Sequence, residues 1–461
     1  MMSEPSVPRV LIAGAASGVG KTTVTVGLAS ALRARGFRIA VFKCGPDYLD
    51  PGYLTRAAGV PCRNLDGWMM GRDAVLATFA RASSGADLAL VEGVMGLFDG
   101  ASPTGEDGSS AEIAKWLRAP VLLVVDASGM ARTIAAVATG FAAFDPDLNL
   151  AGLICNRVGG RGHLDLLRTA AGPRAIVGGL PEETELAFPE RHLGLVNPHE
   201  DTVPERFFTA WGELVAGWFD LERVVAIART APALPDCEAP RMPRRTGASC
   251  RIGIASDGAF HFYYDDNLRQ LERLGATLVR FSPIHDAGLP DVDGLYFGGG
   301  YPEVHAEALS RNEAMRKETR AFAECGGPIY GECGGLMYLS RAIRTLDGAR
   351  HSMVGLVPGD AVMTPRLQAL GYVEVETQAA SILGPAGLRF RGHQFRYSDF
   401  HTASDAVDRI YAVRRRRGEV FREGYRVGSV LASYVHAHWA SNPLVAERLV
   451  EACVAHAARR S

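Results

Sequence analysis

A cysteine followed by two glycines stands out in the C-terminal half of the sequence. Cys333 lies in the stretch YGECGGLMYL, directly after Glu332; an apolar, strand-like run leads into it and a helix-like run follows it. A tight turn from strand to helix needs glycine, because the crowded backbone leaves no room for larger side chains, and it exposes the residue at its apex. The positive end of the following helix favours a thiolate. The pattern predicts that Cys333 is a nucleophile in acyl transfer.

Such a thiol needs hydrogen-bond donors for the oxyanion that develops on its substrate. We expect one donor to be the amide of Gly334. The FGGGYPE loop, residues 297–303, follows the preceding strand-like run and offers a second donor through Gly299 or Gly300. The three glycines therefore form the predicted oxyanion and glutamine-binding set.

A general base must also lie within reach of the thiol. The stretch SYVHAHWASNP ends another strand-like run and contains His436 and His438. We expect the two imidazoles to point to opposite faces of this strand, so that at most one reaches Cys333. His436 is the favoured base and His438 is then structural. No residue that would orient the imidazole is evident, so the site is predicted to be a dyad or to be oriented by an unidentified group.

A second site is predicted near the N-terminus, where the first strand-like run ends in GAASGVGKTT. Small residues let backbone amides approach a phosphate, and the following helix directs its positive end at the same place. The leading glycine is Gly14 instead of residue 15, a spacing that resembles dethiobiotin synthetase and its relatives; the alternative is a glycine-rich turn without a ligand. The residues expected to bind ATP here are Gly18, Val19, Gly20, Lys21, Thr22 and Thr23.

Acidic residues follow two further strand-like runs, in KCGPDYLDP and VEGVMGLFDG. Because the carboxyl ends of parallel strands gather at one edge of a sheet, Asp47 and Glu92 can join Thr22 around one Mg²⁺, and Lys43 can add positive charge near the transferred phosphoryl group. The alternative is that the acids cap helices or face solvent. Asn156 either reads an adenine edge or is a structural asparagine.

The elements that must position these residues alternate between strand and helix. Apolar strand-like runs separated by amphipathic segments predict a parallel, doubly wound α/β sheet. A helical stretch follows at about 200–231, then a proline-rich linker at 230–249, after which the alternation restarts and ends in a mixed sheet. We predict three parts: 1–199, 200–249 and 250–461. The expected strands are 9–15, 37–43, 87–94, 120–127, 150–158, 251–257, 276–283, 294–300, 328–335, 372–378 and 429–439.

Composition sets outer limits on function. The 461 residues, of which 47% are hydrophobic and 22% charged, carry a net charge of -2, which gives no sign of nucleic-acid binding. The eight cysteines include no CxxC pair, which argues against a zinc knuckle and against a disulfide framework. With no signal-peptide pattern and no apolar run of membrane-spanning length, we expect a cytoplasmic location and no membrane partner.

The ordered motifs as a set resemble the cobyrinic acid a,c-diamide synthase family of cobalamin biosynthesis over almost the whole chain. They are GAASGVGKTT, FKCGPDYLDP, LVEGVMGLFDG, ICNRV, PERHLGLV, FGGGYPE, YGECGGLMYL, GHQFRYS and SYVHAHWASNP. The resemblance implies a dethiobiotin synthetase-like P-loop domain followed by a class I glutamine amidotransferase domain. It implies ATP, Mg²⁺ and glutamine as reactants and amidation of two acetate groups of cobyrinic acid, or of hydrogenobyrinic acid as the close variant.

By the same resemblance, Cys333 is the glutaminase nucleophile and His436 its activator. The residues expected around the metal and the corrin carboxylates are Asp47, Tyr48, Leu49, Glu92 and Asp99. The chain departs from the family in GHQFRYS, where relatives usually carry glutamate and histidine at the places of Gln394 and Arg396; we expect this segment to be a loop that touches the corrin or a domain interface. A homodimer is a further expectation.

Three other functions compete with this one. The nearest alternative is the same chemistry on nickel-sirohydrochlorin. Cobyric acid synthase shares the architecture, but KCGPDYLDP and PERHLGLV resemble the diamide synthases more closely. The third alternative, a partitioning-type ATPase switch with a non-catalytic C-terminal domain, belongs to a different class. The presence of both Cys333 and His436 argues against it.

Overall fold

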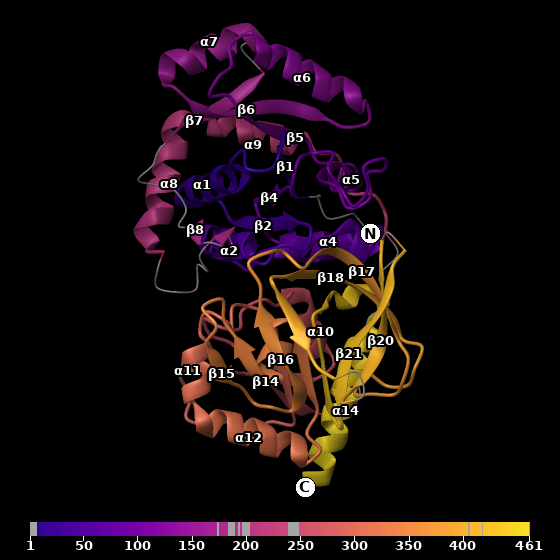
Figure 1. Ribbon diagram of the computed structural model, residues 1–461. Helices are drawn as coiled ribbons and strands as arrows, with labels where there is room; N and C mark the ends of the chain where they lie inside the picture. The colour runs from indigo at the N-terminus through magenta and orange to yellow at the C-terminus, as the bar shows by residue number, and fades with distance from the viewer. Residues whose placement is uncertain are drawn as a thin grey trace. The chain divides into compact units, whose positions relative to one another are not determined.

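The chain forms two compact units, Met1–Pro240 and Arg241–Ser461. The computed structural model describes residues 7–172, 175–182, 190–191, 194–195, 203–237, 249–403, 406–416 and 418–460 (Figure 1). In the described residues, no helix is both long and apolar enough to cross a lipid bilayer. Most of the predicted linker lies outside the described residues, as does half of PERHLGLV, of which β8 (Glu190–Arg191) and β9 (Gly194–Leu195) are described.

A seven-stranded sheet, parallel throughout, forms the centre of the first unit. Its strand order is β3-β2-β4-β1-β5-β6-β7, which confirms the predicted doubly wound fold. Strands β3 and β7 were not predicted. Strand β3 was missed because it is only three residues long, and β7 because it contains two glycines, which are rare in strands. The strands are β1 (Arg9–Gly14), β2 (Ile39–Cys44), β3 (Arg63–Leu65), β4 (Leu88–Glu92), β5 (Val121–Asp126), β6 (Leu150–Val158) and β7 (Ile176–Pro181).

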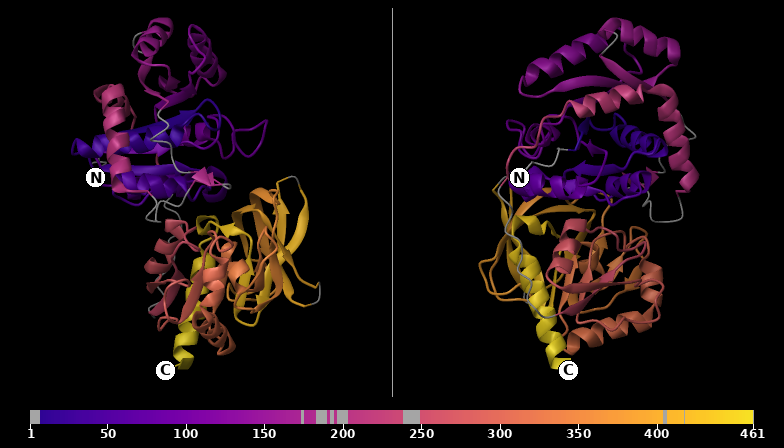
Figure 2. Two further views of the ribbon diagram at one scale, coloured as in Figure 1. Left: turned by 60° about the vertical axis from the view of Figure 1, so that its left-hand side comes forward. Right: turned by 180° about the vertical axis from the view of Figure 1, so that it is seen from behind.

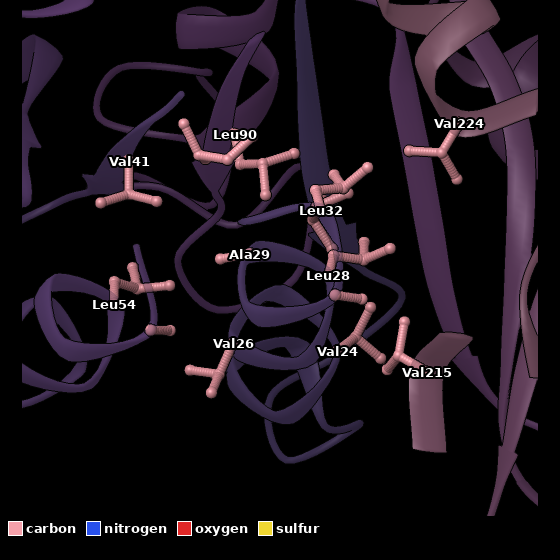
Figure 3. Close-up of a cluster of buried hydrophobic side chains, with 14 of the residues drawn as sticks. Val24, Val26, Leu28, Ala29, Leu32, Val41, Leu54, Leu90, Val215 and Val224 are labelled. Atoms are coloured by element: carbon pink, nitrogen blue, oxygen red, sulfur yellow. The ribbon is translucent and has the colours of Figure 1, made fainter. Parts of the chain in front are cut away.

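The helical stretch at about 200–231 is two helices, α8 (Glu205–Trp218) and α9 (Leu221–Arg229), and both join the core of the first unit. The chain breaks between them where the Asp220 carboxylate accepts a hydrogen bond from the Arg223 amide and caps α9. Helix α8 crosses α1 (Lys21–Ala34) closely: a Cβ built at Gly27 would lie 2.4 Å from Cγ2 of Val215. Figure 3 shows Val215 beside Val24 in this apolar cluster.

Seven more helices complete the described part of the first unit. They are α2 (Asp50–Ala58), α3 (Gly67–Met70), α4 (Arg72–Ser83), α5 (Ser110–Trp116), α6 (Thr133–Phe144) and α7 (Arg161–Ala171), together with α1. Helix α1 packs between β-strands and α8, with Val26, Leu28 and Leu32 fully buried. The P-loop therefore leads directly into a helix that is largely buried in the core of the unit.

The second unit contains a ten-stranded mixed sheet of order β11-β10-β12-β13-β22-β21-β20-β17-β18-β23. Neighbouring strands pair in parallel from β11 through β10, β12 and β13 to β22. From β22 through β21, β20, β17 and β18 to β23, neighbouring strands pair antiparallel. Figure 2 shows the antiparallel strands, in gold, as one side of this unit. The strands are β10 (Cys250–Ala255), β11 (Ala276–Phe281), β12 (Gly294–Phe297), β13 (Ile329–Glu332), β17 (Ala369–Thr377), β18 (Arg389–Arg396), β20 (Asp408–Arg415), β21 (Val420–Val427), β22 (Val430–Ser433) and β23 (His436–Ala437).

A smaller four-stranded sheet and several helices surround this sheet. The strands are β14 (Ser340–Arg344), β15 (Arg350–Ser352), β16 (Val357–Met363) and β19 (Ser398–His401). The helices are α10 (Asp265–Arg273), α11 (Ala306–Arg311), α12 (Glu313–Glu324), α13 (Gly334–Leu339), the 3-10 turn η2 (Trp439–Ser441) and α14 (Leu444–Arg460). The strand predicted at 429–439 is interrupted after Ser433, and this interruption shapes the site described below.

Candidate active sites

The first candidate site is the turn between β1 and α1. Gly18 (φ +76°) and Gly20 (φ +91°) adopt left-handed backbone conformations that other residues rarely tolerate. Lys21, Thr22 and Thr23 form the first turn of α1, and the Lys21 ammonium donates a 2.6 Å hydrogen bond to the carbonyl of Met95. These conformations at the N-terminus of α1 are compatible with the anion-binding turn that the sequence predicts.

Two side chains of the CNRV motif donate hydrogen bonds to backbone carbonyls of this turn. Asn156 lies within β6, and its Nδ2 donates to the carbonyl of Val19 at 2.9 Å. A Cβ built at Gly20 would lie 2.2 Å from that Nδ2. Arg157 (φ +57°) donates to the carbonyl of Gly18 at 3.1 Å and pairs with Asp126 at 2.5 Å. These contacts correspond to the structural alternative for Asn156, and Arg157 is a supporting residue that the sequence analysis missed.

Four charged or polar side chains meet at the ends of β2 and β4. Lys43 Nζ lies 2.7 Å from Oε1 of Glu92 and 2.6 Å from Oδ2 of Asp50. Thr22 Oγ1 donates to the same Oε1 of Glu92 at 2.7 Å. Burial raises the pKa of Glu92 above its ordinary value, and Lys43 opposes that shift. Asp50 was not predicted as a member of this cluster, because its position at the start of α2 reads as an ordinary first-turn acid.

This cluster has the donors that Mg²⁺ prefers. Oε2 of Glu92 is buried and has no hydrogen-bond partner among the described residues. Asp47 Oδ1 accepts hydrogen bonds from the amides of Leu49 and Asp50, and burial raises the pKa of this carboxyl. Mg²⁺ is commonly held by one or two carboxylates together with water and substrate phosphates. Thr22, Asp47 and Glu92 therefore fit the ion.

The residues predicted to contact the corrin lie on the loops beside the cluster. Leu49 is the N-cap residue of α2, and Tyr48 precedes it, half-buried. Asp99 is exposed, and its Oδ2 accepts a hydrogen bond from the Gly96 amide at 3.0 Å. Both loops follow carboxyl ends of neighbouring strands, where open α/β sheets bind ligands.

The second candidate site is the turn at Cys333, which has the geometry of a nucleophile elbow. Cys333 has φ +49° and ψ −99° at the head of α13, a conformation that costs a non-glycine residue about 1–3 kcal/mol. A Cβ built at Gly334 would lie 3.0 Å from Cδ of Pro302, and one built at Gly335 would lie 2.3 Å from the carbonyl oxygen of Phe297. The glycines are required because the chain passes directly against the neighbouring loop.

The two predicted oxyanion loops do lie together. A Cβ built at Gly334 would be 3.2 Å from the amide nitrogen of Gly300. The Gly299 amide already donates to the carbonyl of Phe262 at 3.3 Å, whereas no backbone acceptor for the Gly300 amide occurs in the described part of the chain. The geometry therefore favours Gly300 over Gly299 as the second donor.

The thiol and the imidazole are both buried, and each lies beside strand β18. Cys333 Sγ lies 4.0 Å from the carbonyl of Phe395, and His436 on β23 pairs with His393. Burial, with a smaller contribution from Glu303, raises the pKa of Cys333 to about 12. Burial, and next the neighbouring His393, lowers the pKa of His436 to about 3. Both shifts favour the neutral thiol and the neutral imidazole, so the expectation that the helix N-terminus favours a thiolate is wrong for this buried site without substrate.

His436 and His438 occupy separate surroundings, but not because they point to opposite faces of one strand, as was expected. The His436 ring lies against Gly299, where a built Cβ would be 2.3 Å from its Cε1. The His438 ring packs 4.7 Å from the ring of Tyr264, and its Nδ1 accepts a 3.4 Å hydrogen bond from Ala440. The separation arises because β23 ends at residue 437 and the chain turns into η2. Two residues on a continuous strand at this spacing would share a face.

The segment GHQFRYS is mainly strand β18, so the expectation of a loop was wrong. Gln394 is 1% exposed and donates to Oε2 of Glu423 at 2.6 Å. Arg396 pairs with Asp399 at 2.5 Å and stacks 4.6 Å from the ring of Tyr434. Strand pairing within the sheet requires this regular backbone. The two departures from the family pattern therefore belong to the surroundings of Cys333.

Comparisons with known proteins identify a nucleotide-binding domain and a glutamine amidotransferase domain in this chain. A family model described as the CobQ/CobB/MinD/ParA nucleotide binding domain matches residues 10–196, and one described as the CobB/CobQ-like glutamine amidotransferase domain matches residues 251–444. A relative from Leptospira interrogans (serovar copenhageni) is 50% identical, covering 97% of this chain and 99% of its own. A relative from Syntrophotalea carbinolica is 48% identical, covering 97% of this chain and 99% of its own. One from Dehalococcoides mccartyi strain CBDB1 is 43% identical, covering 96% of this chain and 97% of its own. All three are named cobyrinate a,c-diamide synthase.

Proposed function

Since this chain belongs to the cobyrinate a,c-diamide synthase family, we propose that it amidates the a and c acetate groups of cobyrinic acid or of hydrogenobyrinic acid. The nitrogen comes from glutamine and the driving force from ATP. The observation that carries the proposal is the strained Cys333 elbow, with Gly300 against Gly334 and His436 against the adjacent Gly299, on a chain that also has a P-loop. A nucleotide switch would need no such thiol.

The glutaminase half-reaction takes place at the elbow. His436 accepts the Cys333 proton as the sulfur attacks the side-chain amide carbon of glutamine, and the amides of Gly300 and Gly334 donate to the resulting oxyanion. The tetrahedral intermediate collapses, the C–N bond breaks, and ammonia leaves with the proton from His436. Water then hydrolyses the thioester, which yields glutamate and restores the thiol.

The ligase half-reaction uses the P-loop. The turn amides and Lys21 bind the phosphates of ATP, and Lys43 adds positive charge beside the transferred phosphoryl group. Thr22, Asp47 and Glu92 would hold Mg²⁺, which neutralises phosphate charge when bound. A substrate carboxylate attacks the γ-phosphorus to give an acyl phosphate and ADP. Ammonia then attacks the acyl carbon, phosphate leaves, and the amide forms.

The test is mass spectrometry of the products formed from a panel of tetrapyrrole acids with ATP, Mg²⁺ and glutamine. Cobyrinic or hydrogenobyrinic acid should lose about 1 Da for each carboxylate converted to an amide, with two conversions and two ADP per molecule. If only nickel-sirohydrochlorin gained two amide groups, the proposed substrate would be wrong. If a corrin gained four amide groups, the proposed positions of amidation would be wrong. The proposal also places the chain in the cytoplasm as a homodimer, which fractionation and light scattering check.

A further inference from the structure

A buried carboxylate lies directly before the nucleophile. Glu332 is 1% exposed and ends β13, one residue before Cys333. Its Oε2 accepts a 2.8 Å hydrogen bond from the hydroxyl of Tyr296. Its Oε1 accepts from the hydroxyl of Tyr330 at 3.0 Å and from the backbone amide of Ala437 at 3.1 Å. Three neutral donors therefore surround this carboxylate, and no ion pair to it occurs among the described residues.

The third of these donors belongs to the residue that follows His436. Regular pairing of β22 ends at Ser433, and β23 consists of two residues only. The position of His436 therefore depends on contacts other than a continuous strand ladder. The bond from Ala437 to Glu332 joins the backbone beside the base to the residue beside the nucleophile.

The opposite end of the same segment is held in a similar way. Glu423, 4% exposed, accepts hydrogen bonds from Oγ of Ser433 at 3.2 Å and from the amide of Tyr434. The Cys333 amide in turn donates to the carbonyl of Ser433 at 2.7 Å. Residues 433–437 are thus fixed at both ends by buried carboxylates, but only Glu332 joins the elbow to the histidine end.

Burial of a carboxylate is costly unless strong hydrogen bonds compensate it. Burial raises the pKa of Glu332 to about 7, and the bonds from Ala437, Tyr296 and Tyr330 oppose that shift. A fully apolar core would be cheaper at this position if packing were the only requirement. The arrangement suits a group whose task is geometric alignment.

We propose that Glu332 is the positioning residue of the Cys333–His436 pair: it fixes the backbone after His436 relative to the elbow. In a triad, an acid orients the base through its ring; here the alignment passes through the main chain. The inference rests on the proposed glutaminase function. It assigns to Glu332 no contact with the reacting atoms.

The test compares Glu332→Met, which keeps similar volume without an acceptor, with Glu332→Gln, which keeps an oxygen for the Ala437 amide. For the Met variant we expect a 10- to 100-fold lower kcat for glutamine hydrolysis, a KM for glutamine within threefold, and unchanged amidation with ammonia. For the Gln variant we expect kcat within about threefold of the wild type. If the Met variant does not fold, Glu332→Asp is used in its place. Its side chain is one methylene shorter, and we expect a partial loss of kcat.

A matched control removes a different low-exposure carboxylate from the same unit. Asp360 pairs with Arg344 at 3.1 Å and with Arg350 at 3.2 Å, in the smaller sheet. Asp360→Ala should lower thermal stability without changing kcat. A wild-type kcat in the Met variant, an equal loss in the Gln variant, or a parallel loss of ammonia-dependent amidation would each overturn the inference. Cys333→Ala separates the hypotheses: if that variant still hydrolyses glutamine, the proposed function fails as well.

Discussion

The contact between Gly299 and His436 makes a quantitative prediction for Gly299→Ala. Gly299 has no left-handed backbone conformation, so alanine can adopt its φ and ψ without strain. The new Cβ would lie 2.3 Å from Cε1 of His436. Carbon atoms pack at about 3.5 Å or more, so the imidazole must move by ~1 Å. Misplacement of a catalytic group by about 1 Å can lower the rate about 10²-fold.

We therefore expect Gly299→Ala to lower kcat for glutamine hydrolysis about 100-fold. Amidation supplied with ammonia should stay within twofold of the wild type, because it bypasses the thiol. The assay measures glutamate release and amide formation in parallel. Gly140→Ala on α6 is the control, since a Cβ there meets nothing within 4 Å. Glutamine hydrolysis within threefold of the wild type in Gly299→Ala would refute the placement of His436 as the base.

Further predictions concern both sites. Cys333→Ala should abolish glutamine-dependent amidation while ammonia still supports it; retained glutamine use would show that the elbow is not the glutaminase. Lys21→Ala should abolish amidation from either nitrogen source, and ammonia-dependent synthesis by this variant would contradict the ATP site. Burial lowers the pKa of His393 to about 4, of His436 to about 3 and of His438 to about 4, so the unfolded state binds more protons between those values and about 6.5. These histidines therefore contribute a rise of the free energy of unfolding with pH across that window, so the difference in this free energy between the wild type and His438→Gln, from urea titrations at several pH values, should grow with pH.

The order of elements along the chain could be predicted from its local patterns. The strand predicted at 150–158 is β6 with the same limits, and the helix predicted at GAASGVGKTT is α1. The errors fall where tertiary contacts decide. Edge strand β3 is too short to give a pattern. The long helical stretch breaks at Phe219 because its two halves pack on different parts of the same core.

The local turns of both sites were also predictable, whereas their supports were not. Glycine at 334 and 335 reports a crowded turn directly in the sequence, and so does the P-loop pattern. By contrast, Arg157 reaches Gly18 across 139 positions, and Glu332 reaches Ala437 across 105. Neither side chain carries a local signal of its partner, since an arginine after a strand and a glutamate in a buried run have many ordinary explanations.

The sequence by itself determined where the chain turns sharply and which chemical groups stand at those turns, because backbone crowding and helix N-termini act over a few residues. Only the tertiary structure decided which candidate donor lies against Gly334 and which histidine lies against Gly299. That choice depends on strand register and on the interruption after Ser433, and both are set by pairing between segments that are distant in the sequence.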